Sequence, residues 1–238
     1  MKQSQLAWIL NRMGDLQAQI GKPGEALRAY QQAEDILRKQ DREHRGTFFE
    51  YVQIWLAESL ERKGLVLSTL GKSADARLAT REAVKIRRDR VAASPALIWY
   101  KSELAVCLSR QGQVERRAGQ AADAVASYRE TIALTGESPE LKPRHHFTLA
   151  CCHAQLASLA NEAGSGLEPQ GSSAEIKRAM AEFKLAIDSG YGCIASVRTE
   201  SSLDILRTRE DFQKLVKELE AKISKPPEDI SPTMDRSK

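Results

Sequence analysis

Apolar and small residues recur along the chain in one fixed order. A leucine, a second leucine, a small residue, a glycine and an alanine follow one another at steps of four, four, seven and five residues. The three complete copies are Leu6, Leu10, Gly14, Gly21, Ala26; Leu56, Leu60, Gly64, Gly71, Ala76; and Leu104, Leu108, Gly112, Gly119, Ala124. Residues four apart share one face of an α-helix, so the first three positions predict a helix, here called helix A. The later glycine predicts a turn into a second helix, helix B.

A fourth copy is less regular but keeps the register. It is formed by Leu149, His153, Ala157, Gly164 and Ala179, with about ten residues inserted before the alanine. Beyond the alanine of each copy, a bulkier residue and a small one recur at steps of four and three. These pairs are Tyr30 and Ala33, Thr80 and Ala83, Tyr128 and Thr131, and Phe183 and Ala186. Helix B is therefore expected to present the same face in all four copies.

The repeat predicts an all-α domain over residues 1–224. Its helical hairpins are expected at about 3–45, 46–92, 95–137 and 139–190, followed by closing helices over 193–224. Phe212, Leu215, Val216 and Leu219 form one apolar face on an otherwise charged segment, as expected of a terminal capping helix. Residues 225–238 have no periodicity and predict a disordered tail.

Glycine-hinged hairpins with a small residue at the crossing and an aromatic on helix B resemble the tetratricopeptide (TPR) repeat. The resemblance covers residues 5–190, and LNRMGDLQAQIGKPGEALRAYQQAEDI carries it best. The copies start 50, 48 and 45 residues apart, against about 34 for the simple repeat. The helices are therefore expected to be extended, as in kinesin-light-chain-like arrays. The resemblance implies a right-handed α-solenoid with a C-terminal capping helix.

The closing segment has a narrower resemblance. The runs LACCHAQLASLANEAG and SSLDILRTREDFQKLVKEL are similar to the end of TPR regions found C-terminal to bacterial serine/threonine protein kinases. That likeness implies a kinase as a neighbouring region or a partner. Kinase activity of this chain itself is not expected, because its sequence has no glycine-rich loop after a strand, no HRD-type loop and no DFG-type metal site.

In TPR arrays helix A lines a concave groove, so the resemblance also implies which residues would face a ligand. These are Asn11, Asp15 and Gln19 in the first copy, Glu58, Glu61 and Thr69 in the second, and Ser109, Gln113, Arg116 and Arg117 in the third. The groove is expected to run from acidic to basic. Relatives that hold a peptide carboxylate use a Lys/Asn/Arg clamp at such positions; here only Arg110 fits, so that binding mode is not expected.

One cluster of side chains is a candidate metal or redox site. His145, His146, Cys151, Cys152 and His153 are residue types that zinc selects. Their spacing does not place four of them together, however, and His153 occupies the position of a repeat leucine. The favoured interpretation is a half-buried core histidine beside small core thiols, with no metal, no cofactor and no catalytic residue. A metal- or redox-responsive module stays open as an alternative.

Two further sets of residues have plain structural interpretations. The tryptophans at 8, 55 and 99 lie near the starts of helices A and are expected in the core. The basic run from Lys85 to Arg90 is expected on the solvated outer face of helix B rather than against nucleic acid.

The composition agrees with an all-α domain and indicates where in the cell the protein is expected. Of the 238 residues, 42% are hydrophobic, 5% aromatic and 29% charged, with a net charge of +4. The polarity predicts no membrane span, and the broken N-terminal apolar segment predicts no secretory signal. Four irregularly spaced cysteines favour reduced thiols, and hence the cytoplasm.

The sequence therefore predicts a non-enzymatic scaffold that binds a peptide or helical segment of a partner protein in its groove. The alternatives are the regulatory TPR region of a kinase polypeptide, or of its partner, and the metal- or redox-responsive module. No polar helix precedes Trp8 and Ile9. We therefore expect the apolar residues at this N-terminal edge to be covered by a partner, by a second copy of the chain, or by upstream repeats.

Overall fold

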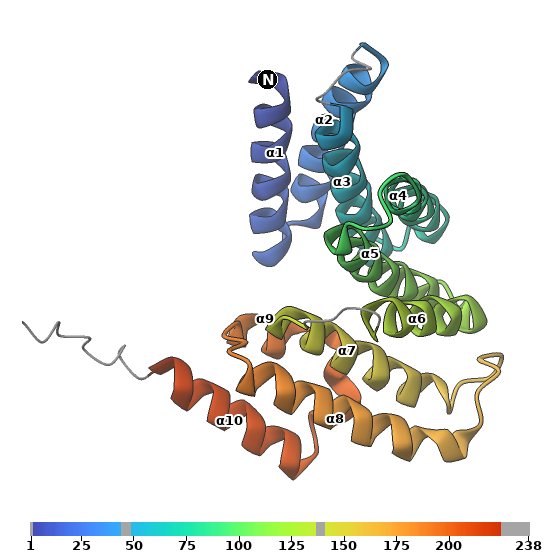
Figure 1. Cartoon of the computed structure of the whole chain (residues 1–238), viewed down its shortest axis with the longest axis vertical. Helices are drawn as coiled ribbons and strands as arrows, with labels where there is room; N and C mark the ends of the chain where they lie inside the picture. Colours follow the sequence, from blue (N-terminus) through green and yellow to red (C-terminus); the bar gives the residue numbers. More distant parts are fainter. Residues whose placement is uncertain (1, 44–48, 137–140, 225–238) are drawn as a thin grey trace, which may run out of the picture.

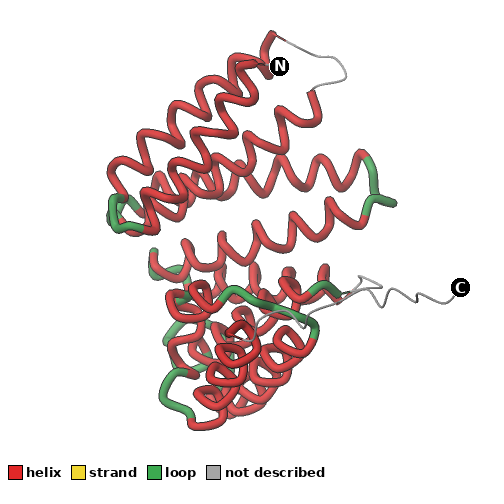
Figure 2. The backbone as a smooth tube through the Cα atoms, turned by 90° about the vertical axis from the view of Figure 1, so that its left-hand side faces the viewer, coloured by secondary structure: helices red, strands yellow, loops and turns green. Residues whose placement is uncertain are grey.

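The computed structural model describes residues 2–43, 49–136 and 141–224. Its α-helices are α1 (Lys2–Gln19), α2 (Pro23–Glu43), α3 (Phe49–Thr69), α4 (Ser73–Ala93), α5 (Ile98–Arg117), α6 (Ala121–Gly136), α7 (Pro143–Leu159), α8 (Ser172–Asp188), α9 (Ile194–Thr199) and α10 (Glu210–Ser224). Two 3₁₀-helices, η1 (Pro169–Gly171) and η2 (Ser201–Leu206), complete the set. Over these three ranges the chain forms no strand (Figure 2).

The helices pair in chain order into four hairpins. The hairpins are α1 with α2, α3 with α4, α5 with α6, and α7 with α8, and each packs on the next (Figures 1 and 2). The first helices of neighbouring hairpins also contact one another, from α1 to α3, α3 to α5 and α5 to α7. The chain is thus an all-α solenoid, as the repeat predicts.

Small residues let the two helices of a hairpin cross closely. A Cβ added to Gly14 would lie 2.6 Å from Tyr30 Cε1, and one added to Gly64 would lie 2.5 Å from Thr80 Cγ2. Gly14 and Gly64 therefore meet Tyr30 and Thr80, the bulkier residues of helix B that the repeat places opposite them. The turn glycines are left-handed, with φ between 74° and 77° at Gly21, Gly71, Gly119 and Gly164.

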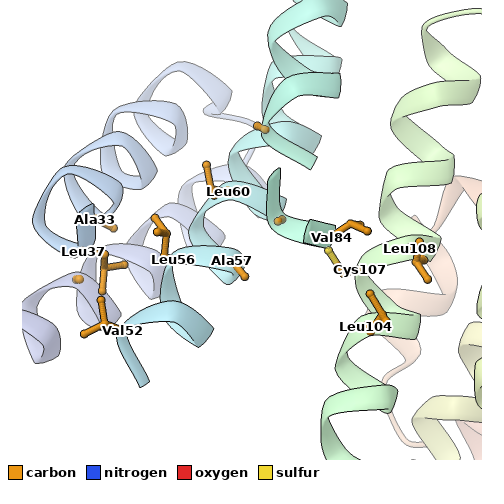
Figure 3. Packing of buried hydrophobic residues seen from close by; sticks show 13 residues of the cluster. Ala33, Leu37, Val52, Leu56, Ala57, Leu60, Val84, Leu104, Cys107 and Leu108 are labelled. Carbon is orange, nitrogen blue, oxygen red and sulfur yellow. The ribbon is translucent and has the colours of Figure 1, made fainter. Parts of the chain in front are cut away.

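The largest apolar cluster joins the first three hairpins. Leu37 of α2, Leu56 of α3 and Leu104 of α5 are each no more than 3% exposed, and Val84 and Cys107 lie among them (Figure 3). Fully burying one such leucine contributes about 1.5–3 kcal/mol. The core thus runs between hairpins, so each hairpin depends on its neighbours for stability.

The C-terminal segment closes the last hairpin. Phe212 of α10 stacks on Phe183 of α8 with ring centroids 5.0 Å apart. Tyr191, just after α8, stacks on Phe147 of α7 at 4.4 Å. Helix α10 buries Phe212 and Leu219 and is the lowest helix in Figure 1, at the opposite end of the stack from α1.

Some expectations fall on residues outside the described ranges. These are the tail at 225–238 and the predicted hairpin boundaries near 45 and near 137–139. Among the helices that are described, none is both long enough and apolar enough to cross a bilayer.

Candidate functional site

A hollow of about 480 Å³ runs along the first helices of the hairpins. Helices α1, α3, α5 and α7 all contribute to its wall, Arg87 reaches it from α4, and residues of the segment 191–200 close one side. We call this hollow the groove. Its charged lining consists of Arg12, Glu58, Glu61, Arg62, Arg87, Glu103, Arg110, Arg144 and Glu200.

Three of these arginines occupy the same position in successive repeats. Arg12, Arg62 and Arg110 each lie two residues before the small residue of their helix A. Helices A stack side by side, so this position recurs along one face and all three side chains reach the groove. The result is a row of arginines, one from each of the first three hairpins.

Carboxylates lie between these arginines. Arg12 Nη1 is 3.3 Å from Asp15 Oδ2, and Arg62 Nη2 is 2.6 Å from Glu58 Oε1. Arg12 also pairs with Glu58, and Arg62 with Asp15. Tyr30 Oη donates a hydrogen bond to Asp15 Oδ1 at 2.8 Å, which holds that carboxylate in place beside Arg12. The first two hairpins are therefore joined by an ion-pair network.

A second network joins α3, α4, α5 and α7. Glu61 of α3 is 1% exposed; it pairs with Arg110, and one of its oxygens is 3.4 Å from Arg87 Nη2. Arg87 Nη1 is 3.5 Å from Glu103 Oε2, and Arg144 Nη2 is 2.7 Å from Glu103 Oε1. Because Glu61 and Arg87 are both buried, each would be costly without the other.

Burial in the groove makes the protonated form of two of its arginines less favourable. Burial, together with the positive charges of Arg12 and Arg87, lowers the pKa of Arg62 to about 10. Burial also lowers the pKa of Arg110 below its ordinary value. An additional negative group in the groove would stabilise these guanidinium ions.

Among the charged side chains of the groove, the groups without a hydrogen-bond partner are donors. The Nε atoms of Arg12, Arg62 and Arg87 are buried and have no acceptor in the protein. Among the residues that the structure describes, no glutamate of the groove has a buried oxygen without a donor. A ligand in the groove cannot reach these buried Nε atoms, but it can reach the exposed parts of arginine side chains such as Arg12, 41% exposed, and Arg144, 53% exposed, which suit carboxylates.

The predicted site residues of the first two copies divide into three kinds. Asp15 and Glu58 belong to the ion-pair network. Asn11 is buried and does not line the groove, whereas Glu61, 1% exposed, lines it and pairs with Arg110. Asn11 accepts a hydrogen bond from Ser59 Oγ at 3.0 Å and holds α1 to α3. Gln19 and Thr69 are exposed but lie outside the residues lining the groove.

The predicted residues of the third copy contact the chain itself. Ser109 is 6% exposed and lies 3.6 Å from the Cys152 thiol. Gln113 Nε2 donates to Ser202 Oγ at 3.1 Å and to Glu200 Oε1 at 3.4 Å. The segment that leads into η2 therefore rests on α5 and divides the helix A face, where a continuous groove was expected.

A second hollow lies beyond this division. It measures about 400 Å³ and includes Gln113, Arg116 and Arg117 in its wall. Arg116 bonds to Gln155 Oε1 at 2.5 Å and to Ser158 Oγ at 2.7 Å, so much of its hydrogen-bonding capacity is used within the chain. Arg117 is exposed, with Ser201 Oγ at 3.4 Å.

The charge pattern of the helix A face also differs from the expectation. The sequence predicts an acidic end and a basic end, yet acids and bases alternate and pair across neighbouring helices. Packing brings together charges about fifty residues apart in the sequence, such as Arg12 and Glu58. The expected segregation of sign is therefore wrong.

The histidine and cysteine cluster is part of the α7–α8 interface. His146 Nδ1 lies 2.7 Å from Glu182 Oε2, and His153 Nδ1 lies 2.6 Å from Glu175 Oε2. The predicted burial of His153, Cys151 and Cys152 is confirmed. Within the described ranges, no three histidine, cysteine or acidic side chains come together in a way that could hold a metal ion.

Two structural interpretations need correction. Trp8 and Trp99 are 47% and 50% exposed and are not core residues, whereas Trp55 packs against the core. Arg87 is buried between α3 and α5 rather than exposed on an outer face; its neighbour Arg88 is exposed and pairs with Glu130. Arg87 and Arg88 are adjacent in the sequence, and the rotation of about 100° between successive helical residues places one in the groove and the other on the surface.

Two features of the groove were not predicted from the sequence: the row of arginines and the segment that closes the groove. The arginines had a signal, because their offset from the small residue is the same in three copies. The closing segment had none, since its residues lie outside the repeat and reach α5 only through tertiary packing.

Comparison with known proteins adds little to this geometry. No protein-family model and no curated protein matches the sequence. Among solved structures, the chain is similar to a kinesin-light-chain-like protein of Podospora anserina with nearly identical TPR-like repeats. The sequence identity is 16% and the TM-score 0.44, over 94% of this chain and 99% of that one. At this TM-score the likeness carries no weight, and the assignment of the fold rests on the packing of the hairpins themselves.

Proposed function

We propose that this TPR-like solenoid is a non-enzymatic interaction module that binds an acidic segment of a partner protein in the groove. The row formed by Arg12, Arg62 and Arg110 is the observation that supports the proposal most directly. A repeated cation along a hollow favours a ligand whose negative groups also repeat, as in an extended or helical peptide. Arginine suits carboxylates because its planar fork binds them through two hydrogen bonds.

The pairing inside the groove favours a segment with several acidic residues over a single anion. Each arginine of the row already has a carboxylate neighbour, so a ligand has to compete with Glu58 and Glu61 or use the donors that remain. A peptide with several carboxylates can contact more than one of the exposed guanidinium groups at once, which a single anion cannot do.

A ligand for the experiment can be selected from a displayed library of random peptides, with the full chain as the target. Acidic sequences are the expected product. Their affinity is then measured by fluorescence anisotropy for the wild type and for Arg144→Glu. Arg144 lines the groove and is 53% exposed, so its substitution reverses a charge there without opening the core.

Arg88→Glu is a matched control. Arg88 is 54% exposed and pairs with Glu130 at 2.7 Å, as Arg144 pairs with Glu103 at 2.7 Å, but it lies on α4 away from the groove. We expect Arg144→Glu to weaken binding at least about tenfold, or about 1.4 kcal/mol, and Arg88→Glu to leave it unchanged. Equal affinities of the two variants would contradict the proposal.

The link to a kinase stays a prediction. It rests on the sequence likeness of the closing segment, and no contact within the described residues bears on it. The metal- or redox-responsive alternative is less favoured, because the histidines of the cluster pair with glutamates and its thiols are buried.

A further inference from the structure

The connection between α4 and α5 exposes five apolar residues in a row. Pro95, Ala96, Leu97, Ile98 and Trp99 all have exposed side chains, and the last three are 51%, 46% and 50% exposed. A run of this kind is unfavourable in water unless it has a function. It therefore marks a contact surface.

This connection lies at one edge of the solenoid. The helices of a hairpin are antiparallel, so the turns within the first three hairpins, at 20–22, 70–72 and 118–120, lie at the opposite edge. Because α3 packs on α5 and α5 on α7, the N-terminal ends of these three helices follow one another along the edge that carries the connection.

Three exposed side chains form a row along this edge. Tyr51, Trp99 and Arg144 each lie five residues before the first leucine of their repeat, and so occupy the same position on neighbouring helices. They are 57%, 50% and 53% exposed. Tyrosine and tryptophan are enriched where a bilayer meets water, because each ring is apolar with one polar group. Arginine binds the phosphate groups found at the same depth.

The helix ends around the connection carry more basic than acidic residues. Neither α5 nor α7 has an acidic residue in its first turn. The first turn of α3 has Glu50, which lies 3.4 Å from Arg90 in the last turn of α4. The basic residues of these ends are Arg90, Lys101, Lys142 and Arg144. A surface with negative charges is therefore attracted to this edge.

The directions of the apolar side chains favour a lipid surface over a protein helix. Successive residues of a helix are rotated by about 100°, so Leu97, Ile98 and Trp99 spread around the start of α5. A helix or strand of a partner would cover one of these directions. The headgroup layer of a bilayer instead surrounds a protruding turn on all sides.

We propose that this edge rests on a membrane that contains anionic lipids, with Leu97, Ile98 and Trp99 inserted among the headgroups. The chain lies on the bilayer and does not cross it, and no described helix is of a kind that could. Apolar insertion and attraction to the basic helix ends act together, because either alone gives only weak attachment. The proposal does not depend on what the groove binds.

Co-sedimentation of the full chain with vesicles tests the proposal. We expect binding to vesicles of phosphatidylcholine with phosphatidylserine, and weaker binding to phosphatidylcholine alone. Leu97→Asp should lower the partition coefficient at least about tenfold, because it removes an apolar contact and adds a charge that anionic lipid repels. Leu97 is the N-cap of α5 and makes no capping hydrogen bond, so aspartate is compatible with the fold there.

Leu78→Asp is the matched control. Leu78 is 67% exposed and lies near the start of α4, toward the opposite edge, so this variant should bind vesicles as the wild type does. Circular dichroism establishes that both variants are folded.

Vesicles with brominated lipid chains locate the contact, since bromine quenches the fluorescence of tryptophans that enter the bilayer. Quenching should persist in Trp8→Phe, which removes a tryptophan that is 47% exposed on α1, and be lost in Trp99→Phe. A wild type that binds neither kind of vesicle would overturn the proposal and leave the exposed turn to another protein. Equal binding of Leu97→Asp and the wild type, or quenching that survives Trp99→Phe, would also overturn it.

Discussion

The ring of Tyr128 on α6 occupies the space next to Gly112 on α5 that a side chain would need. A Cβ at position 112 would lie 2.7 Å from Tyr128 Cε1. Tyr128 is 1% exposed, so its ring has little room to move. The crossing of α5 and α6 therefore requires glycine, as the crossing of α1 and α2 does at Gly14.

Replacing that glycine should destabilise the solenoid. We expect Gly112→Ala to lower the free energy of unfolding by about 1–3 kcal/mol, because overpacking forces the ring or the helix to shift. Urea denaturation measures the change. Gly24→Ala is the control, since a Cβ there meets nothing within 4 Å. Equal stability of Gly112→Ala and the wild type would show that the crossing is looser than described.

Arg116 should contribute to stability. Arg116→Ala removes hydrogen bonds to Gln155, Ser158 and Glu162 of α7 and its following turn, and should cost about 1–2 kcal/mol. Arg117→Ala removes an exposed side chain and should change stability by less than about 0.5 kcal/mol. Thermal unfolding of the two variants distinguishes them, and similar losses would contradict the assigned contacts.

His145 should make stability depend on pH. Burial, and then the nearby charges of Arg144 and Lys142, lower the pKa of His145 below its ordinary value. The folded state therefore favours the neutral ring, whose Nδ1 accepts the Lys142 N–H at 3.2 Å. This contribution to stability is complete above about pH 6.5 and is lost as the pH falls through the folded-state pKa.

His145→Asn tests this, because an amide oxygen can accept the same N–H without titrating. The variant should lose less unfolding free energy than the wild type between about pH 7 and pH 5. Parallel pH profiles would contradict the assignment. Chemical denaturation at each pH provides the measurement.

The four cysteines should differ in reactivity. Cys193 is exposed, whereas the other three are buried. Burial raises the pKa of Cys107 to about 11 and that of Cys152 to about 12, and raises the pKa of Cys151 well above its ordinary value. Since the thiolate is the nucleophile, iodoacetamide should label Cys193 first and the others only on unfolding. Mass spectrometry identifies the site; rapid labelling of a buried cysteine would be inconsistent with this packing.

The hairpins could be predicted from the sequence because they depend on short-range patterns. Gly64 and Thr80 are sixteen residues apart, and their contact follows from helix periodicity and a tight turn. The same holds for the left-handed glycines, which the turn geometry requires. The register of each hairpin is thus fixed within one repeat.

The groove could be predicted only in part, because it depends on how successive hairpins stack. Arg87 turns inward to Glu61 and Glu103 because α4 packs between the helices that carry them. No pattern within one repeat specifies such a contact. The closing contact of Gln113 with Ser202 joins residues 89 positions apart and lies outside the repeat altogether.

Site-specific photocrosslinking can locate a bound partner segment in the groove. A benzoylphenylalanine at position 148 would replace Thr148, which lines the groove, and one at position 78 would replace the exposed Leu78 on α4. We predict that a selected acidic peptide crosslinks to the chain modified at 148 and not to the chain modified at 78. Binding that persists with crosslinks from position 78 alone would contradict binding in the groove.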